Sequence, residues 1–159
     1  MIVTARAQID IAHPRPSTFE YAVAASTLPL AFVGYGLIPA IRAATLLAPG
    51  PLATGQRRRI ENSDGSVLIE EVLSVEQDNL HRYRIVSGLK PPFSLLVRWG
   101  ESEWRFLNEG TGTRIEWRYD FALTTPLVWP FAAALIRGQF QGAMQRCLDR
   151  LKARLEATG

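Results

Sequence analysis

Three residues of this sequence are of types that could orient or protonate a small molecule: Arg58, Glu70 and Tyr83. The turn signal Ser63-Asp64-Gly65 lies between the first two and predicts a β-hairpin. A three-residue loop would place Arg58 opposite Glu70, whereas a two-residue loop would place Arg59 there. An arginine–carboxylate pair at a cavity wall can orient a polar group of a ligand, and a tyrosine hydroxyl can donate a hydrogen bond or a proton.

Each of these interpretations has a simpler alternative. The strand parity leaves open whether the Arg58–Glu70 pair faces a cavity or lies on the convex face of a sheet, and we favour a solvated pair on the convex face. For Tyr83 we likewise favour a strand tyrosine whose hydroxyl lies in water. The alternative roles are ligand binding and acid catalysis.

The remaining reactive residue types give no further motif. His13 and His81 have no partner at ligand spacing, so we expect no metal and no cofactor. Neither a nucleophile elbow nor a glycine-rich phosphate loop is present. Cys147 is the only cysteine, which excludes an internal disulfide, and its place beside an apolar helical stripe predicts a buried, inert thiol.

These residues must be positioned by strands and by one long helix. Alternating apolar and polar residues predict strands over 3–11, 56–62, 66–75, 81–87, 94–107 and 113–123, with Gly100 as a bulge. Short helices or turns are expected from Pro16 to Ala53. One helix is expected over 126–157, with an apolar stripe of Ile136, Phe140, Met144, Leu148, Leu151 and Leu155. This order predicts an α+β fold in which a curved antiparallel sheet wraps around a long C-terminal helix and short helices close a cavity.

Composition sets broader limits on function. The 159 residues suit one domain over 1–159, with 47% hydrophobic and 21% charged residues. The net charge of +3 comes from scattered arginines, so we expect no nucleic-acid partner. Prolines and glycines interrupt the apolar segment 21–56, which argues against stable membrane insertion. The single cysteine and the absence of a signal peptide favour the cytoplasm.

Several motifs carry a resemblance to a known family. They are Ala12-His13-Pro14-Arg15-Pro16-Ser17-Thr18-Phe19 after the first strand, Gly55-Gln56-Arg57-Arg58 with Asp64-Gly65 and Glu70, and Gly112-Thr113-Arg114 before Trp117. In this order, together with the terminal helix, they resemble the START/polyketide cyclase-like (SRPBCC) superfamily and its uncharacterised bacterial polyketide cyclase/dehydrase-like members. The resemblance implies a helix-grip fold with an internal cavity. Members bind lipids, sterols, polyketides or plant metabolites, and some catalyse cyclisation or dehydration.

We therefore expect a hydrophobic small molecule as partner, bound without demonstrated chemistry. The residues expected to contact it are Phe32, Tyr35, Leu37, Ile38, Arg58, Glu70, Tyr83, Trp104, Trp117, Tyr119, Phe121, Phe140 and Met144. One alternative is an aromatase/cyclase-like or dehydratase-like enzyme acting on a polyketide-type substrate. A second is a protein- or membrane-interaction module, or a homodimer, using segment 21–56, whose only charged residue is Arg42, and Leu127-Val128-Trp129-Pro130-Phe131.

Overall fold

A computed structural model describes residues 1–158 of the protein. Seven antiparallel strands form one sheet in the order β1-β7-β6-β5-β4-β3-β2. The strands are β1 (Ile2–Ile11), β2 (Ile41–Leu46), β3 (Arg57–Asn62), β4 (Val67–Glu76), β5 (Leu80–Ser87), β6 (Val97–Glu109) and β7 (Gly112–Leu123). From β3 to β7 each strand pairs with its neighbour in sequence, whereas β1 closes the far edge against β7.

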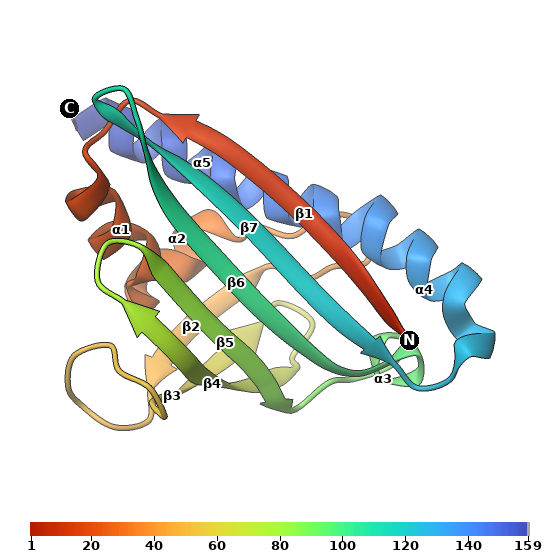
Figure 1. Ribbon diagram of the computed structural model, residues 1–159. Helices are drawn as coiled ribbons and strands as arrows, with labels where there is room; N and C mark the ends of the chain where they lie inside the picture. The colour runs from red at the N-terminus through yellow and green to blue at the C-terminus, as the bar shows by residue number, and fades with distance from the viewer. Residues whose placement is uncertain (159) are drawn as a thin grey trace.

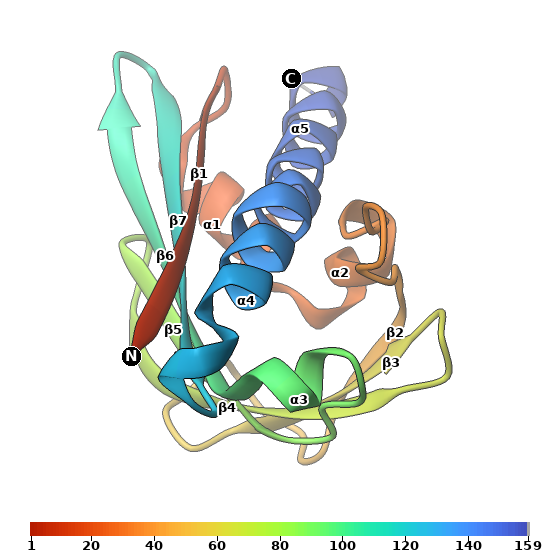
Figure 2. The same cartoon turned by 90° about the vertical axis from the view of Figure 1, so that its right-hand side faces the viewer.

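The helices lie on the concave side of this sheet and at its two ends (Figures 1 and 2). They are α1 (Arg15–Val23), η1 (Ala25–Thr27), α2 (Leu28–Ala31), α3 (Phe93–Leu96), η2 (Pro126–Val128), α4 (Trp129–Leu135), the π-helical turn η3 (Ile136–Phe140) and α5 (Gln141–Thr158). The sheet curves around α5, while α3 and α4 lie together at the end opposite α1. This is the α+β architecture that the element order predicts.

Alternation along β7 determines which side chains reach the interior. Ile115, Trp117, Tyr119 and Phe121 are buried on the concave face, and the charged residues between them face outward. The predicted stripe of the terminal helix packs against this face, since Ile136, Met144, Leu148, Leu151 and Leu155 are all buried. Phe140 is only half-buried, because it borders a cavity.

Three local predictions are wrong. Residues 41–46, expected as helix or turn, form β2 because backbone pairing with β3 outweighs the weak local pattern. The strand expected from Ser94 begins only at Val97, since residues 93–96 form α3. The terminal helix is interrupted by η3, in which the amide of Gln141 bonds the carbonyl of Ile136 five residues earlier.

Gly100 is not the predicted bulge. It pairs regularly with Phe121, and the register shift in this strand lies between Val97 and Trp99. A Cβ atom at Gly100 would lie 2.9 Å from ring atoms of both Tyr119 and Phe121. Glycine therefore leaves room for two aromatic rings. Within residues 1–158, no helix is both long enough and apolar enough to cross a bilayer.

Candidate functional site

A cavity of about 130 Å³ lies between the concave face of the sheet and the helical layer. Its wall comes from β3, β4, β5 and β7, from η3, and from the segments that follow α2 and β5. Ten of the thirteen predicted residues line it: Phe32, Leu37, Ile38, Arg58, Glu70, Tyr83, Trp117, Tyr119, Phe121 and Phe140. The structure thus brings together residues that lie up to about two thirds of the chain apart in sequence.

Tyr35, Trp104 and Met144 do not line the cavity. Tyr35 lies on the outer surface with its ring 5.3 Å from the guanidinium of Arg146. Trp104 is buried deeper, with its ring 4.2 Å from that of Trp117. Met144 is in the solid part of the core, one turn beyond Phe140. Their aromatic or apolar side chains made these three residues candidates, but residue type does not show where the cavity ends.

Arg58 and Glu70 form a buried ion pair at the cavity wall. The β3–β4 register places them opposite one another, as the three-residue loop predicts, and Nε of Arg58 donates to Oε1 of Glu70 at 2.8 Å. The residues are only 4% and 7% exposed, so the favoured convex-face interpretation is wrong. Parity explains the outcome, because Arg57 and Glu71, one position away, occupy the outer face.

The electrostatics of this pair are balanced. Burial opposes the charged form of Arg58, but the charge and hydrogen bond of Glu70, together with Tyr83 and Tyr119, outweigh that effect, so the pKa of Arg58 is raised. Its guanidinium also lies 4.6 Å from the centre of the Tyr83 ring, within the range of a cation–π contact. Arg58 therefore remains a cation inside the fold, held by a carboxylate and an aromatic face.

Two tyrosines complete the polar end of the cavity. Tyr83 is 4% exposed and its hydroxyl accepts from Nε1 of Trp104 at 3.4 Å, so the solvated interpretation of Tyr83 is wrong. Burial raises the pKa of Tyr83 and of Tyr119, which keeps both phenols protonated. Within residues 1–158 the Tyr119 hydroxyl forms no hydrogen bond, and Arg58 donates only through Nε. The phenol of Tyr119 and the terminal guanidinium nitrogens of Arg58 are thus donors free to meet a ligand.

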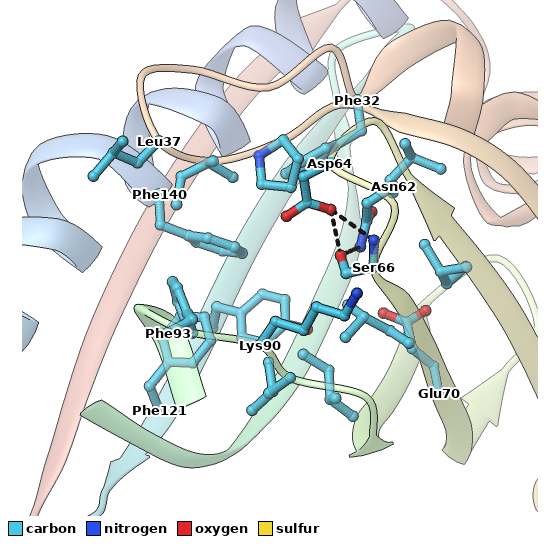
Figure 3. A pocket seen from close by; sticks show the side chains of 18 of the residues that line it. Phe32, Leu37, Asn62, Asp64, Ser66, Glu70, Lys90, Phe93, Phe121 and Phe140 are labelled. Carbon is cyan, nitrogen blue, oxygen red and sulfur yellow. Dashed lines mark hydrogen bonds between the residues drawn. The ribbon is translucent and has the colours of Figure 1, made fainter. Parts of the chain in front are cut away.

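The part of the cavity wall away from Glu70 is aromatic (Figure 3), and Tyr119 joins it to the polar end. Tyr119 and Phe121 are stacked with ring centres 4.6 Å apart. The ring of Phe140 packs against both in T-shaped geometry, with its centre 5.1 Å from that of Tyr119 and 4.9 Å from that of Phe121. The ring centres of Phe93 and Phe121 are 5.3 Å apart. An apolar body would lie against these rings while its polar group reached Arg58 and Tyr119.

A polar cluster at the β3–β4 turn borders the mouth (Figure 3). The Asp64 carboxylate accepts from the amide and the hydroxyl of Ser66, at 2.9 and 2.6 Å, and Asn62 donates to the same hydroxyl at 3.0 Å. The two bonds from Ser66, and the positive charge of Lys90, lower the pKa of Asp64. The sequence identifies these residues only as turn formers. That they line the cavity together with Lys90 depends on the tertiary fold, because Lys90 is distant in sequence.

The exposed members of the wall mark the entrance. Leu37, Asp64, Lys90, Pro91 and Pro92 all line the cavity and are exposed to solvent. Leu37 is held in place by its amide, which donates to Oε1 of Gln139 at 2.6 Å.

His81 lies outside the cavity, although it is buried beside Tyr83 with ring centres 5.1 Å apart. Burial, reinforced by the charge of Arg58, lowers the pKa of His81 to about 3. Its Nε2 atom has no hydrogen-bond partner among the described residues. In residues 1–158 no three histidine, cysteine or acidic side chains are grouped so that they could hold a metal ion.

This combination of fold and cavity agrees with a sequence comparison. The model of the family described as polyketide cyclase/dehydrase and lipid transport matches residues 3–156. The chain belongs to this family. No curated protein sequence matches it. Membership in the polyketide cyclase/dehydrase and lipid transport family confirms the resemblance seen in the sequence.

Solved structures show the same helix-grip fold as this family member. Ara h 8.0201 superposes with a TM-score of 0.75 at 12% identity, covering 99% of each chain. A START superfamily protein from Mycobacterium smegmatis gives 0.73 at 13% identity, covering 98% of this chain and 99% of that one. Ginseng major latex-like protein 151 from Panax ginseng gives 0.73 at 12% identity over 97% of each chain. At these identities the similarity establishes the fold.

Proposed function

We propose that this protein binds a neutral, largely apolar small molecule that carries one hydrogen-bond acceptor. The observation that carries the proposal is the cavity itself, with the rings of Tyr119, Phe121 and Phe140 along one part of its wall and the donors of Arg58 and of the Tyr119 hydroxyl at its polar end. Most ligand sites combine apolar walls with a few polar groups that fix orientation. Family membership is consistent with such binding.

The ligand is proposed to be neutral because the polar end already has balanced charge. Arg58 is paired with Glu70 at 2.8 Å, and both are buried. A ligand carboxylate at this end would add a buried negative charge without a free counter-ion, which is costly. A carbonyl or hydroxyl oxygen could accept from Arg58 and Tyr119 without that cost.

Cavity size favours a compact ligand or a mobile wall. An engineered apolar cavity of about 150 Å³ holds one benzene molecule, and this cavity measures about 130 Å³. A single ring is therefore about the largest body that the cavity holds as it stands. A lipid, isoprenoid or polyketide-like compound requires Phe140 and Leu37, at the half-buried and exposed part of the wall, to move aside.

Two matched probes test this proposal. Acetophenone has one ring and a carbonyl acceptor, and ethylbenzene has the same ring without the acceptor. Two-dimensional NMR titration should show both shifting resonances of cavity residues, with acetophenone binding more tightly. Tyr119→Phe removes only the hydroxyl and should weaken acetophenone binding by about 1 kcal/mol, roughly fivefold, while leaving ethylbenzene unchanged.

A cavity-filling variant provides the control. Phe140→Trp places a larger ring in the hollow and should abolish binding of both probes. Phe131→Trp makes the same change at an exposed position outside the cavity and should bind them as the wild type does. If Phe140→Trp binds both probes with unchanged affinity, the probes occupy another surface and the proposal is wrong.

The enzymatic alternative is supported by one feature of the same site. Arg58 and Tyr119 could polarise a carbonyl together, and Glu70 is the buried carboxylate beside them that could accept a proton. Such a site would accelerate deuterium exchange of the methyl protons of acetophenone in heavy water, and Tyr119→Phe would slow that exchange. Exchange equal to that in buffer alone would leave binding as the function.

A further inference from the structure

One end of the molecule exposes large apolar side chains. Leu95 of α3 is 65% exposed, Leu127 of η2 is 85% exposed, and Trp129 and Phe131 of α4 are 41% and 71% exposed. We call these four residues the apolar end. Solvent exposure of so many large apolar groups in short neighbouring segments is typical of an interaction surface.

The backbone holds the segments of the apolar end side by side. The amide and hydroxyl of Thr124, just before η2, donate to the carbonyls of Leu96 and Leu95, both in α3, at 3.0 and 2.9 Å. Arg98 donates in turn to the carbonyl of Thr124 at 3.1 Å. Figures 1 and 2 both show α3 and α4 together at this end, away from α1 and the C-terminus.

The charges around the apolar end have a single sign. The four residues of the apolar end lie within residues 86–100 and 121–148. These two ranges contain no aspartate or glutamate. They carry Lys90, Arg98 and Arg137, all exposed, and Arg146, which covers Tyr35. The carboxylates that flank these segments are already engaged. Glu101 is paired with Arg82, Asp120 is bound to Arg118 and Thr4, and Asp149 accepts a hydrogen bond from Gln145.

We propose that the apolar end docks this protein peripherally on an anionic lipid bilayer. Tryptophan and phenylalanine favour the interfacial zone of a membrane, and exposed lysine and arginine are attracted to anionic headgroups. A second copy of the chain fits less well, because a symmetric contact would bring Arg98 and Arg137 against the same cations of its partner. Docking does not depend on whether the cavity binds a ligand.

Co-sedimentation with vesicles tests the docking surface. The wild-type protein should bind vesicles of phosphatidylcholine mixed with phosphatidylserine, bind pure phosphatidylcholine much more weakly, and dissociate as salt is added. Leu127→Ser/Phe131→Ser should weaken binding to the mixed vesicles at least about tenfold, because two apolar side chains no longer leave water. Arg98→Gln/Arg137→Gln should weaken it at least about tenfold through lost attraction.

Matched variants elsewhere control for general effects of these changes. Leu107→Ser alters an exposed leucine near the β6–β7 turn, at the other end of the sheet, and should bind vesicles as the wild type does. Arg42→Gln/Arg154→Gln removes the same net charge from exposed positions and should reduce binding far less. Circular dichroism checks that every variant is folded.

Absence of wild-type binding to mixed vesicles would overturn the proposal, and so would binding that Leu127→Ser/Phe131→Ser leaves unchanged. If the wild type binds no vesicles and is a dimer that the same variant converts to monomers, the apolar end is a contact between copies. Because probe binding in the cavity is measured without vesicles, failure here leaves the proposed function standing.

Discussion

The Arg58–Glu70 ion pair lies directly beside a second pair of the same type on the opposite face of the same two strands. Nε of Arg58 is 2.8 Å from Oε1 of Glu70, and Arg57 is 3.1 Å from Glu71. The inner side chains are 5% and 9% exposed, and the outer ones 55% and 29%. The hairpin thus contains a buried pair and its solvated counterpart, one residue apart.

Removing one member of the buried pair should destabilise the fold strongly. Arg58→Met or Glu70→Leu leaves an uncompensated buried charge, which typically costs about 3–5 kcal/mol. The double variant leaves no such charge and should be more stable than either single variant. Urea denaturation measures the free energy of unfolding for all four proteins.

The outer pair is the matched control. Arg57→Met, Glu71→Leu and their combination should each change the free energy of unfolding by less than about 1 kcal/mol, since solvent screens this pair. Equal effects on the inner and outer pairs would contradict the placement of Arg58 and Glu70 at the cavity wall.

His81 should make stability depend on pH. Its pKa is about 3 in the fold and about 6.5 in the unfolded chain, so between these values the unfolded chain binds more protons. Stability should therefore fall as pH drops below about 6.5, by up to about 1.4 kcal/mol per pH unit from this group. Urea denaturation at pH 7 and pH 5 should show a smaller loss in His81→Phe than in the wild type. An identical loss in the two proteins would show that His81 is accessible to protons when folded.

Cys147 should be unreactive in the native protein. It is 1% exposed, and burial raises the pKa of its thiol to about 12. With an aromatic disulfide reagent at pH 8, it should react at least about a thousandfold more slowly than an exposed thiol. Ser26→Cys supplies that exposed thiol in the same protein. Rapid labelling of native wild-type protein would contradict the packing of α5 described here.

Gly100→Ala should destabilise the fold and disturb the cavity. The added methyl group would lie 2.9 Å from the stacked rings of Tyr119 and Phe121, and overpacking of this kind typically costs about 1–3 kcal/mol. Gly138→Ala is the control, because a methyl group there meets nothing within 4 Å and should have a neutral or stabilising effect. Thermal unfolding of the two variants decides between these expectations.

The sequence predicts those parts of the fold whose pattern is local. The alternation of residues 113–123 and the Ser63–Gly65 turn are strong signals, and both match the structure. β2 is different, because its six residues become a strand only by pairing with β3. Ile136, Phe140 and Met144 recur every four residues, a spacing that a regular helix also shows, so the interruption at η3 is hidden in the sequence.

The site was predictable in composition but not in orientation. The register that joins Arg58 to Glu70 follows from loop length, but the face that the pair occupies follows from the curvature of the whole sheet. Lys90 and Asp64 escaped prediction because they meet at the entrance from separate segments. Met144 and Trp104 were predicted to contact the ligand but lie in the packed core. Their apolar character predicts burial and does not show whether a buried side chain borders the cavity.

The π-helical turn η3 has a consequence for chain length. Its extra residue advances the helix by about 100°, so α4 and α5 present their faces in different phases on either side of it. Deleting one residue between Ile136 and Phe140 would restore a regular helix and rotate α4 relative to the sheet. Phe140 and the exposed side chains of α4 would then point in new directions together. Among related chains, the number of residues in this turn should therefore be held constant more strictly than their identities.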